Sequence, residues 1–190
     1  MNTIATTWTG IRPLIAHNGQ LADPTNPYVM QIKQITSKGS KKMTDDDYEQ
    51  RNRLEWEGSL YWDDDLGAVI PSDNIERCIQ LGAQKSRRGK DVQAAVFCVE
   101  PVIKIEYEGP QDRNKMYASK NFELRKGVRV QTSRLIRCRP MFPVGWKLKF
   151  EIEFDETVVN ESTVRQACIN AGALIGLGDW RPKFGRFTCE

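Results

Sequence analysis

The stretch Trp146–Phe154, WKLKFEIEF, alternates apolar and charged residues without interruption. Aromatic and aliphatic residues occupy every second position from Trp146, and lysines or glutamates occupy the positions between them. Successive side chains of a β-strand point to opposite faces. The pattern therefore predicts a strand with one face in a core and the other in water.

The segments that flank this strand complete the C-terminal half. Upstream, residues 94–107 predict a strand with a break at Pro101, and residues 128–139 alternate as a further strand does. Downstream, Asn160 predicts the N-cap of a helix, and residues 186–189 predict a last strand. The buried stripe of that helix is expected to comprise Val164, Ala167, Cys168, Ala171 and either Leu174 or Ile175.

The N-terminal half follows the same reasoning. Residues 3–16 predict a strand interrupted at Gly10 and Pro13, whereas residues 18–42 are typical of a loop with a short apolar piece at 28–35. Thr44 is expected to cap a helix, with Asp47 as the acid of a capping box. Ser72 is expected to cap a second helix that ends near Lys85, with Gly89 as its stop.

The predicted elements fall in the order β–α–β–β–α–β. This order favours an α+β fold of the ferredoxin-like (RRM-like) type, with two helices on one face of a four-stranded antiparallel sheet. We expect a single domain over residues 1–190, an insertion over 18–66, and a hairpin or loop arm over 108–127.

Composition excludes several classes of protein. The 190 residues are 39% hydrophobic and 28% charged, which fits one sizeable globular domain. No apolar run is long enough for a membrane span, and the opening MNTIATTWTG lacks the features of a signal peptide, so we expect a cytoplasmic protein. Five widely spaced cysteines and a single histidine offer little to a structural zinc site, and we expect no metal and no cofactor.

The net charge of +3 conceals separate clusters of each sign. Bases gather at 38–42, 85–90 and 113–139, and acids at 44–65 and 151–161. Basic clusters of this kind attract phosphates, although solvated faces, helix C-termini and salt bridges explain them equally well. Outside the C-terminal loop, the predicted phosphate contacts are Lys41, Lys42, Lys85, Arg87, Arg88, Lys90, Arg134, Arg137 and Arg139.

The loop that follows the last predicted helix is the most specific feature. Three glycines frame it, and glycine permits positive φ and close approach of a partner. Basic side chains pair with phosphates, and a tryptophan can stack on a base. A helix C-cap followed by a tight turn, with the tryptophan simply buried, is the alternative. The residues concerned are Gly176, Gly178, Gly185, Trp180, Arg181, Lys183 and Arg186.

Signals for catalysis are weak. His17 stands alone beside Asn18 and is expected to make a structural hydrogen bond rather than to act as a general base. The acidic triplets 45–47 and 63–65 are better explained by helix capping and by a turn than by metal binding. Since no nucleotide-binding or hydrolase motif is present, we expect no catalytic residues and no enzymatic activity.

The segment 171–187, AGALIGLGDWRPKFGRF, resembles the glycine-rich signature of the RAMP superfamily, the ferredoxin-like RNA-binding subunits of CRISPR effector complexes. The segments 11–18 (IRPLIAHN) and 69–75 (VIPSDNI) are similar to the first strand and the first helix of its backbone-forming members. RAMP loops usually end in GFG, whereas 184–187 read FGRF. The whole pattern is more similar to small proteins of tailed phages and prophages, which implies a phage-encoded relative that binds nucleic acid and assembles into arcs, rings or filaments.

The leading hypothesis is a non-catalytic protein that binds RNA or single-stranded DNA, with the chain as its own partner in a homo-oligomer. An alternative is a counter-defence protein of a phage that binds a host protein or holds a small nucleotide signal in the glycine loop. The third is a metal-independent ribonuclease built around His17. Binding that weakens steeply with salt would favour the first.

Overall fold

The central strand confirms the alternating pattern. The computed structural model describes the backbone of residues 1–130 and 133–190 and the side chains outside 130–134. In it β9 (Lys147–Phe154) buries Leu148, Phe150, Ile152 and Phe154, while the lysines and glutamates between them face away from the core. One face of the strand is therefore part of a hydrophobic core, as predicted.

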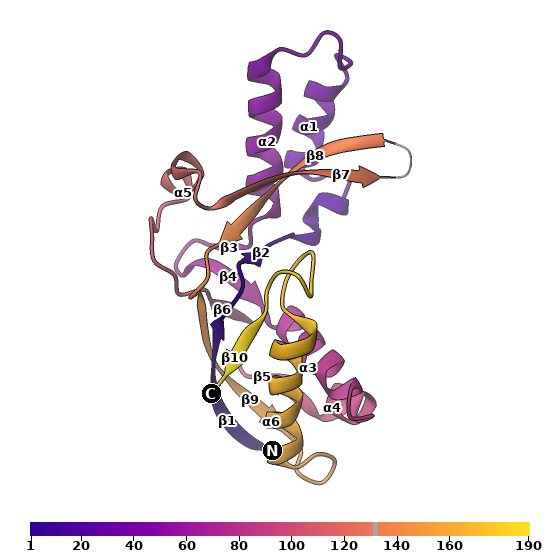
Figure 1. Ribbon diagram of the computed structural model, residues 1–190, viewed down its shortest axis with the longest axis vertical. Coiled ribbons are helices and arrows are strands. Elements are labelled where there is room, and N and C mark those ends of the chain that lie inside the picture. The colour runs from indigo at the N-terminus through magenta and orange to yellow at the C-terminus, as the bar shows by residue number, and fades with distance from the viewer. Residues whose placement is uncertain (131–132) are drawn as a thin grey trace. The chain divides into compact units, whose positions relative to one another are not determined.

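β9 is an inner strand of an antiparallel sheet (Figure 1). It pairs along its whole length with β1 (Asn2–Gly10) and, on its other side, with β5 (Val96–Cys98). β10 (Phe187–Cys189) pairs with the free edge of β1. The order across the sheet is thus β10-β1-β9-β5, and each neighbouring pair is antiparallel.

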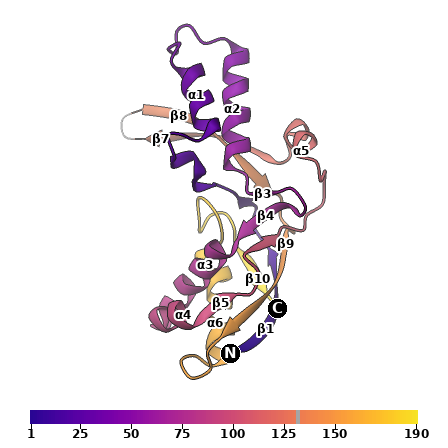
Figure 2. The ribbon, with the colours of Figure 1, turned by 180° about the vertical axis from the view of Figure 1, so that it is seen from behind.

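Two helices cover the buried face of this sheet, and they lie side by side in both views (Figures 1 and 2). They are α3 (Ser72–Gln84) and α6 (Glu161–Asn170), which continues as a π-helical turn over Ala171–Ile175. A Cβ at Gly82 would lie 2.2 Å from the carbonyl oxygen of Ala167, so glycine is what allows the two backbones to approach.

Of the two N-caps predicted for α3 and α6, one is confirmed and the other is wrong. Asn160 caps α6 as predicted, because its side chain accepts the N–H of Thr163. The prediction that Ser72 caps α3 is wrong, since the N-cap position belongs to Pro71 and no side chain caps the helix. The backbone N–H of Ser72 instead donates to the carbonyl of Pro101, which satisfies it without a cap.

The segment 85–107 is more divided than the sequence indicates. Gly89 does not stop a helix but begins α4 (Gly89–Ala95), because the chain turns at Arg87, whose φ is 61°. The predicted strand 94–107 is two short strands in different sheets, β5 and β6 (Val102–Lys104). β6 pairs with β4 (Gly67–Pro71), which pairs with β3 (Trp62–Asp63), and β2 (Leu14–Ile15) is a two-residue strand after Pro13.

The chain forms two compact units. Unit 1 comprises residues 1–15, 62–109 and 142–190 and holds the elements described so far, and unit 2 comprises residues 16–61 and 110–141. The segments expected as an insertion and an arm, 18–66 and 108–127, overlap largely with the two pieces of unit 2. The two segments that lie outside the sheet of unit 1 therefore pack together in one compact unit.

Unit 2 consists of a helical hairpin, a short helix and a β-hairpin. The prediction of a loop over 18–42 is wrong in part, because α1 (Pro27–Thr36) is a helix that begins with Asn26 as its cap and proline at its first position. α5 (Arg113–Ser119) occupies the predicted arm. The single strand expected over 128–139 is two paired strands, β7 (Glu123–Val130) and β8 (Ser133–Phe142).

The second helix of the hairpin is α2 (Asp45–Ser59), and it forms the core of unit 2. It begins with the predicted capping box of Thr44 and Asp47, in which each side chain accepts the backbone N–H of the other residue. Further along, Trp56 is fully buried, and its Nε1 donates to the carbonyl of Phe122 at 2.8 Å. Among the described residues, no helix is both long and apolar enough to cross a membrane.

Candidate functional site

The loop after α6 depends on glycine at each position that frames it. Gly176, Gly178 and Gly185 have φ values of 80°, 79° and 71°, a region that other residues rarely adopt. A Cβ at Gly185 would lie 1.7 Å from the carbonyl oxygen of Leu177. The backbone N–H of Leu177 donates to the carbonyl of Gly185. The expected positive φ is confirmed at all three glycines, and the backbone that approaches them closely belongs to the same chain.

Backbone hydrogen bonds hold this loop against the segment that follows β1. The N–H of Asp179 donates to the carbonyl of Ile15, and that of Gly185 donates to the carbonyl of Pro13, both at 2.8 Å. The N–H groups of Ile11 and Arg12 both donate to the carbonyl of Arg186. The loop is therefore fixed in place, and Arg12 is brought beside it.

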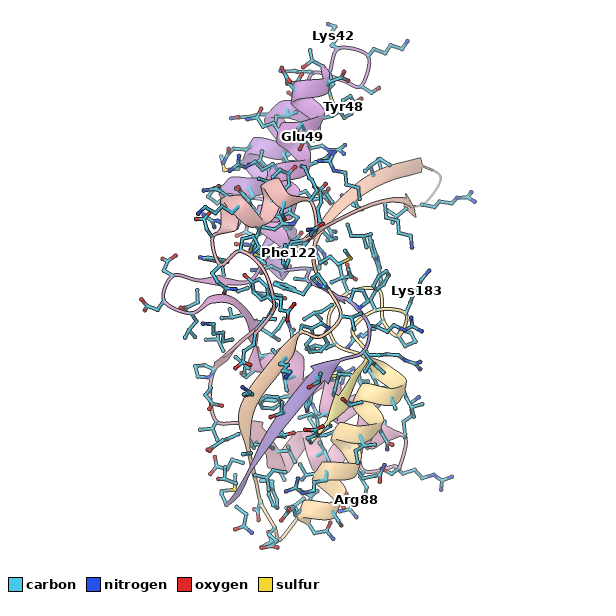
Figure 3. All side chains as sticks on the ribbon, turned by 60° about the vertical axis from the view of Figure 1, so that its left-hand side comes forward. Lys42, Tyr48, Glu49, Arg88, Phe122 and Lys183 are labelled. Atoms are coloured by element: carbon cyan, nitrogen blue, oxygen red, sulfur yellow. The ribbon has the colours of Figure 1, made fainter. Side chains whose placement is uncertain are left out.

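Basic side chains from these two segments line one cleft of unit 1, which we call the basic cleft. It has a volume of about 340 Å³. Within the part of the chain that the structure describes, Arg12, Arg181, Lys183 and Arg186 form no ion pair. Lys183 is among the side chains labelled in Figure 3. The cleft is lined by Arg12, Pro13, Pro182, Lys183, Phe184 and Arg186.

The charge of the basic cleft is therefore not neutralised from within. Arg12, Arg181 and Lys183 are exposed, and Arg186 is half-buried. The Nε of Arg186 is buried and has no hydrogen-bond acceptor among the described residues. A cluster of cations without carboxylate partners attracts anions, and guanidinium groups suit phosphate oxygens in particular.

The aromatic residues beside the basic cleft are only partly covered. Trp180 is half-buried and adopts a positive φ of 51°, so it is not the simply buried side chain of the alternative interpretation. Its ring centroid lies 6.2 Å from that of Phe184, which lines the cleft. Both rings therefore keep part of their surface accessible next to the bases.

The second predicted cluster lies elsewhere in unit 1. At one end of the helix pair, the Nη2 of Arg88 donates to the carbonyl of Val158, just before α6. At the other end, the Sγ of Cys78 donates to the carbonyl of Gly176, which opens the glycine loop. α6 and its π-helical turn lie between these two contacts. Figure 3 accordingly shows Arg88 near the bottom of the view and Lys183 well above it. The exposed bases of this cluster, Lys85, Arg87, Arg88 and Lys90, thus form a separate surface.

The two described arginines of β8 are anchored by one carboxylate of α2. Arg137 and Arg139 project to the same side, as expected, and the Nη1 atoms of both donate to the Glu55 Oε1, at 3.2 and 2.7 Å. The side chain of Arg139 is only 8% exposed, so the salt-bridge alternative describes it and we exclude it from a phosphate-binding face. The side chain of Arg134 lies outside the described residues.

The lysines at the turn between α1 and α2 differ among themselves. Lys41 and Lys42 are exposed, and Lys42 is labelled in Figure 3. Lys38 pairs with Asp47 of the capping box at 2.6 Å. This contact, together with a backbone bond to the Thr44 N–H, lowers the pKa of Asp47. The first acidic triplet therefore serves the start of α2, as predicted.

His17 and the acidic triplets are the residues that the sequence offers for catalysis or metal binding. No three histidine, cysteine or acidic residues there are placed to hold a metal ion. His17 is exposed, and its carbonyl accepts the hydroxyl of Tyr61 at 3.1 Å. Burial raises the pKa of Cys78 to about 12, although the charge of Arg181 acts in the opposite direction. The Cys78 thiol is thus a poor nucleophile at neutral pH.

Comparison with known proteins adds no assignment, since no protein-family model and no curated protein matches the chain. The resemblance to RAMP proteins therefore stays a prediction. The basic cleft is therefore the feature of the molecule that points most directly to a function.

Proposed function

We propose that this protein binds RNA or single-stranded DNA without catalysis, and that the basic cleft is where the strand is held. The observation that carries the proposal is the convergence of Arg12, Lys183 and Arg186 on one cleft without an acidic partner among the described residues. Several fixed cations along one surface suit a polyanion such as nucleic acid.

The chemistry of the cleft suits a single strand better than a duplex. Guanidinium and ammonium groups would bind consecutive phosphates, while the partly exposed Trp180 and Phe184 offer aromatic rings beside them for unstacked bases. Each stacked base contributes about 1–3 kcal/mol in proteins of this kind. Bases in a duplex are already stacked on one another and would not reach these rings.

The topology of unit 1 supports the assignment to the ferredoxin-like class. Its sheet order, β10-β1-β9-β5, places the third strand of the module between the first two. α3 follows the first strand and α6 the third, which is the β–α–β–β–α–β arrangement. A RAMP-like relationship and a phage origin belong to the same proposal, and they rest on the resemblance of the 171–187 segment.

The test is fluorescence anisotropy with labelled 20-nucleotide poly(U) and poly(dT). The double variant Lys183→Glu and Arg186→Glu reverses two charges in the cleft, and we expect affinity to fall at least tenfold. The wild type should also bind much more weakly as salt is raised from 50 to 200 mM. The same RNA should run intact on a gel after incubation.

The control is Lys104→Glu, which makes the same kind of charge change at an exposed lysine of β6, outside the basic cleft. It should keep most of the affinity. Binding that ignores salt, or an equal loss in the control, would contradict the role of the cleft.

A further inference from the structure

Unit 2 contains a second concave site, which is larger than the basic cleft. Its volume is about 450 Å³, within the range of pockets that take small ligands. α1, α2 and β8 contribute its walls. Ile32, Leu135 and Ile136 give it an apolar surface, and the last two are 39% and 48% exposed. We call it the unit 2 pocket.

The charges that line this pocket are strongly unequal. Lys33, Arg51, Arg137 and Arg139 are set against the single carboxylate of Glu55. Basic side chains thus outnumber the carboxylates that line the pocket. A ligand that complements the pocket is therefore an anion, and one with several negative charges suits it best.

The guanidinium groups at the base of the pocket are held in fixed positions. Glu55, whose side chain is 7% exposed, accepts Arg137 and Arg139 on Oε1 and the backbone N–H of Cys138 on Oε2. Arg139 also donates to the Ser59 Oγ at 3.2 Å. Both arginines donate to the same carboxylate, which orients their guanidinium groups before any ligand arrives.

Arg51 adds a donor from the neighbouring helix. Its Nη2 donates to the Asn52 Oδ1 at 2.8 Å and to the carbonyl of Ile136 at 3.4 Å. Its Nε is buried and has no acceptor in the described part of the chain. Arg51 is therefore fixed between α2 and β8 with hydrogen-bonding capacity left over.

We infer that the unit 2 pocket binds a free nucleoside diphosphate, with its base against the apolar wall and its phosphates against Lys33, Arg51 and Arg137. A phosphate group carries about −1.5 to −2 charges at neutral pH and accepts the paired donors of a guanidinium. A fatty acid or other monocarboxylate would cover the apolar wall, but its single charge would match only part of the positive charge that lines the pocket. This site is separate from the basic cleft and does not depend on the proposed binding of nucleic acid.

Isothermal titration calorimetry on the full chain tests the inference. ADP, GDP, UDP and CDP are titrated singly, with inorganic phosphate and octanoate as the partial ligands. We expect at least one diphosphate to bind at least tenfold more tightly than either partial ligand, since only it uses both the cations and the apolar wall. Failure of all four diphosphates, or tighter binding of octanoate, would overturn the inference.

Two variants of exposed residues locate the site without disturbing the core. Lys33→Glu reverses a charge in the pocket, and Leu135→Asp places a charge on the apolar wall. Each should weaken diphosphate binding at least tenfold, while Lys41→Glu, in the same unit but outside the pocket, should leave it unchanged. Unaltered binding in both pocket variants would overturn the inference.

The double variant Lys183→Glu and Arg186→Glu separates the two proposals. It should lose affinity for oligonucleotides and keep the diphosphate site, because its substitutions lie in unit 1. Loss of diphosphate binding in this variant would move the small-ligand site to the basic cleft and overturn the inference. Loss of oligonucleotide binding with diphosphate binding unchanged would support the assignment of the diphosphate site to the unit 2 pocket.

Discussion

Arg139 and Arg186 are the same residue type, follow similar basic stretches of sequence, and have opposite electrostatic surroundings. In unit 2, Arg139 is buried and bonded to the carboxylate of Glu55. In unit 1, Arg186 lines the basic cleft, forms no ion pair with any described residue, and has a buried Nε without an acceptor. The difference lies not in the arginine but in a glutamate contributed by a distant part of the chain.

This contrast shows how a basic cluster is assigned to structure or to binding. An arginine that is buried against a carboxylate is costly to leave without that carboxylate and offers little to a ligand. An arginine that is oriented by backbone hydrogen bonds but left without a carboxylate contributes little to stability and attracts anions. Substitutions at three positions should break or sharpen this distinction.

The largest effect is expected from Glu55→Gln. Loss of the carboxylate charge breaks the buried ion pair between Glu55 and Arg139 on one side, which costs about 3–5 kcal/mol of unfolding free energy. Urea denaturation followed by circular dichroism measures it. Glu161→Gln removes the exposed pair with Arg165 and should cost at most about 1 kcal/mol. Equal costs would abolish the distinction between buried and exposed arginines.

A smaller effect, and one that depends on pH, is expected from Glu49→Gln. Partial burial acts to raise the pKa of Glu49, but hydrogen bonds from Tyr117, Arg125 and Lys120 outweigh it and hold the pKa at about 2. Because the folded pKa lies below the ordinary value of 4.5, the stabilisation is complete above about pH 5 and is lost as pH falls toward 2. Solvent screening at this exposed site limits it to about 1 kcal/mol.

The measurement for Glu49 is the difference in unfolding free energy between wild type and variant at several pH values. The difference should be greatest at pH 7 and should vanish near pH 2. Glu108→Gln changes an exposed glutamate of unit 1 and should give no difference at any of these values. A difference that grows as the solution is acidified would have the wrong sign for this explanation.

The smallest effect on stability is expected from Arg186→Gln. The substitution removes a cation without an ionic partner and leaves the backbone carbonyl of residue 186 to accept from Ile11 and Arg12. The unfolding free energy should change by less than about 1 kcal/mol. The slope of log affinity against log salt concentration should meanwhile decrease by about one, which corresponds to the loss of one phosphate contact. A loss of several kcal/mol would show that Arg186 is structural, as Arg139 is.

Local sequence signals correctly predicted the strand with strong alternation and the two helices with clear N-caps. The alternation of 147–154, the Thr44 capping box and the Asn160 cap all depend on neighbours within a few residues, and all are confirmed. The helix at 27–36 was missed although Asn26 and Pro27 are a sound start signal, because its apolar residues are few and only Ile35 is buried. The two strands of the β-hairpin were predicted as one, because apolar residues recur on both sides of residues 131–132 and no glycine or proline separates them.

The candidate site was predictable in part. The glycine loop, with Lys183 and Arg186, is visible in the sequence because three glycines and several bases fall within a dozen residues. Arg12 gave no such signal, since it lies more than 160 positions away and reaches the cleft through hydrogen bonds between two backbone segments. The pairing of Arg139 with Glu55 was equally unpredictable, because the residues around each of them do not indicate which distant side chain it will contact.

By itself the sequence determined where the chain must bury one face of a strand or helix, where helices are capped, and where only glycine can serve. These properties follow from steric and hydrogen-bonding rules that act between near neighbours in the chain. Only the tertiary structure decided which cations are neutralised and which remain available to a ligand. Electrostatic interactions act through space over a few ångströms, so the fate of each arginine depends on which distant segment packs against it.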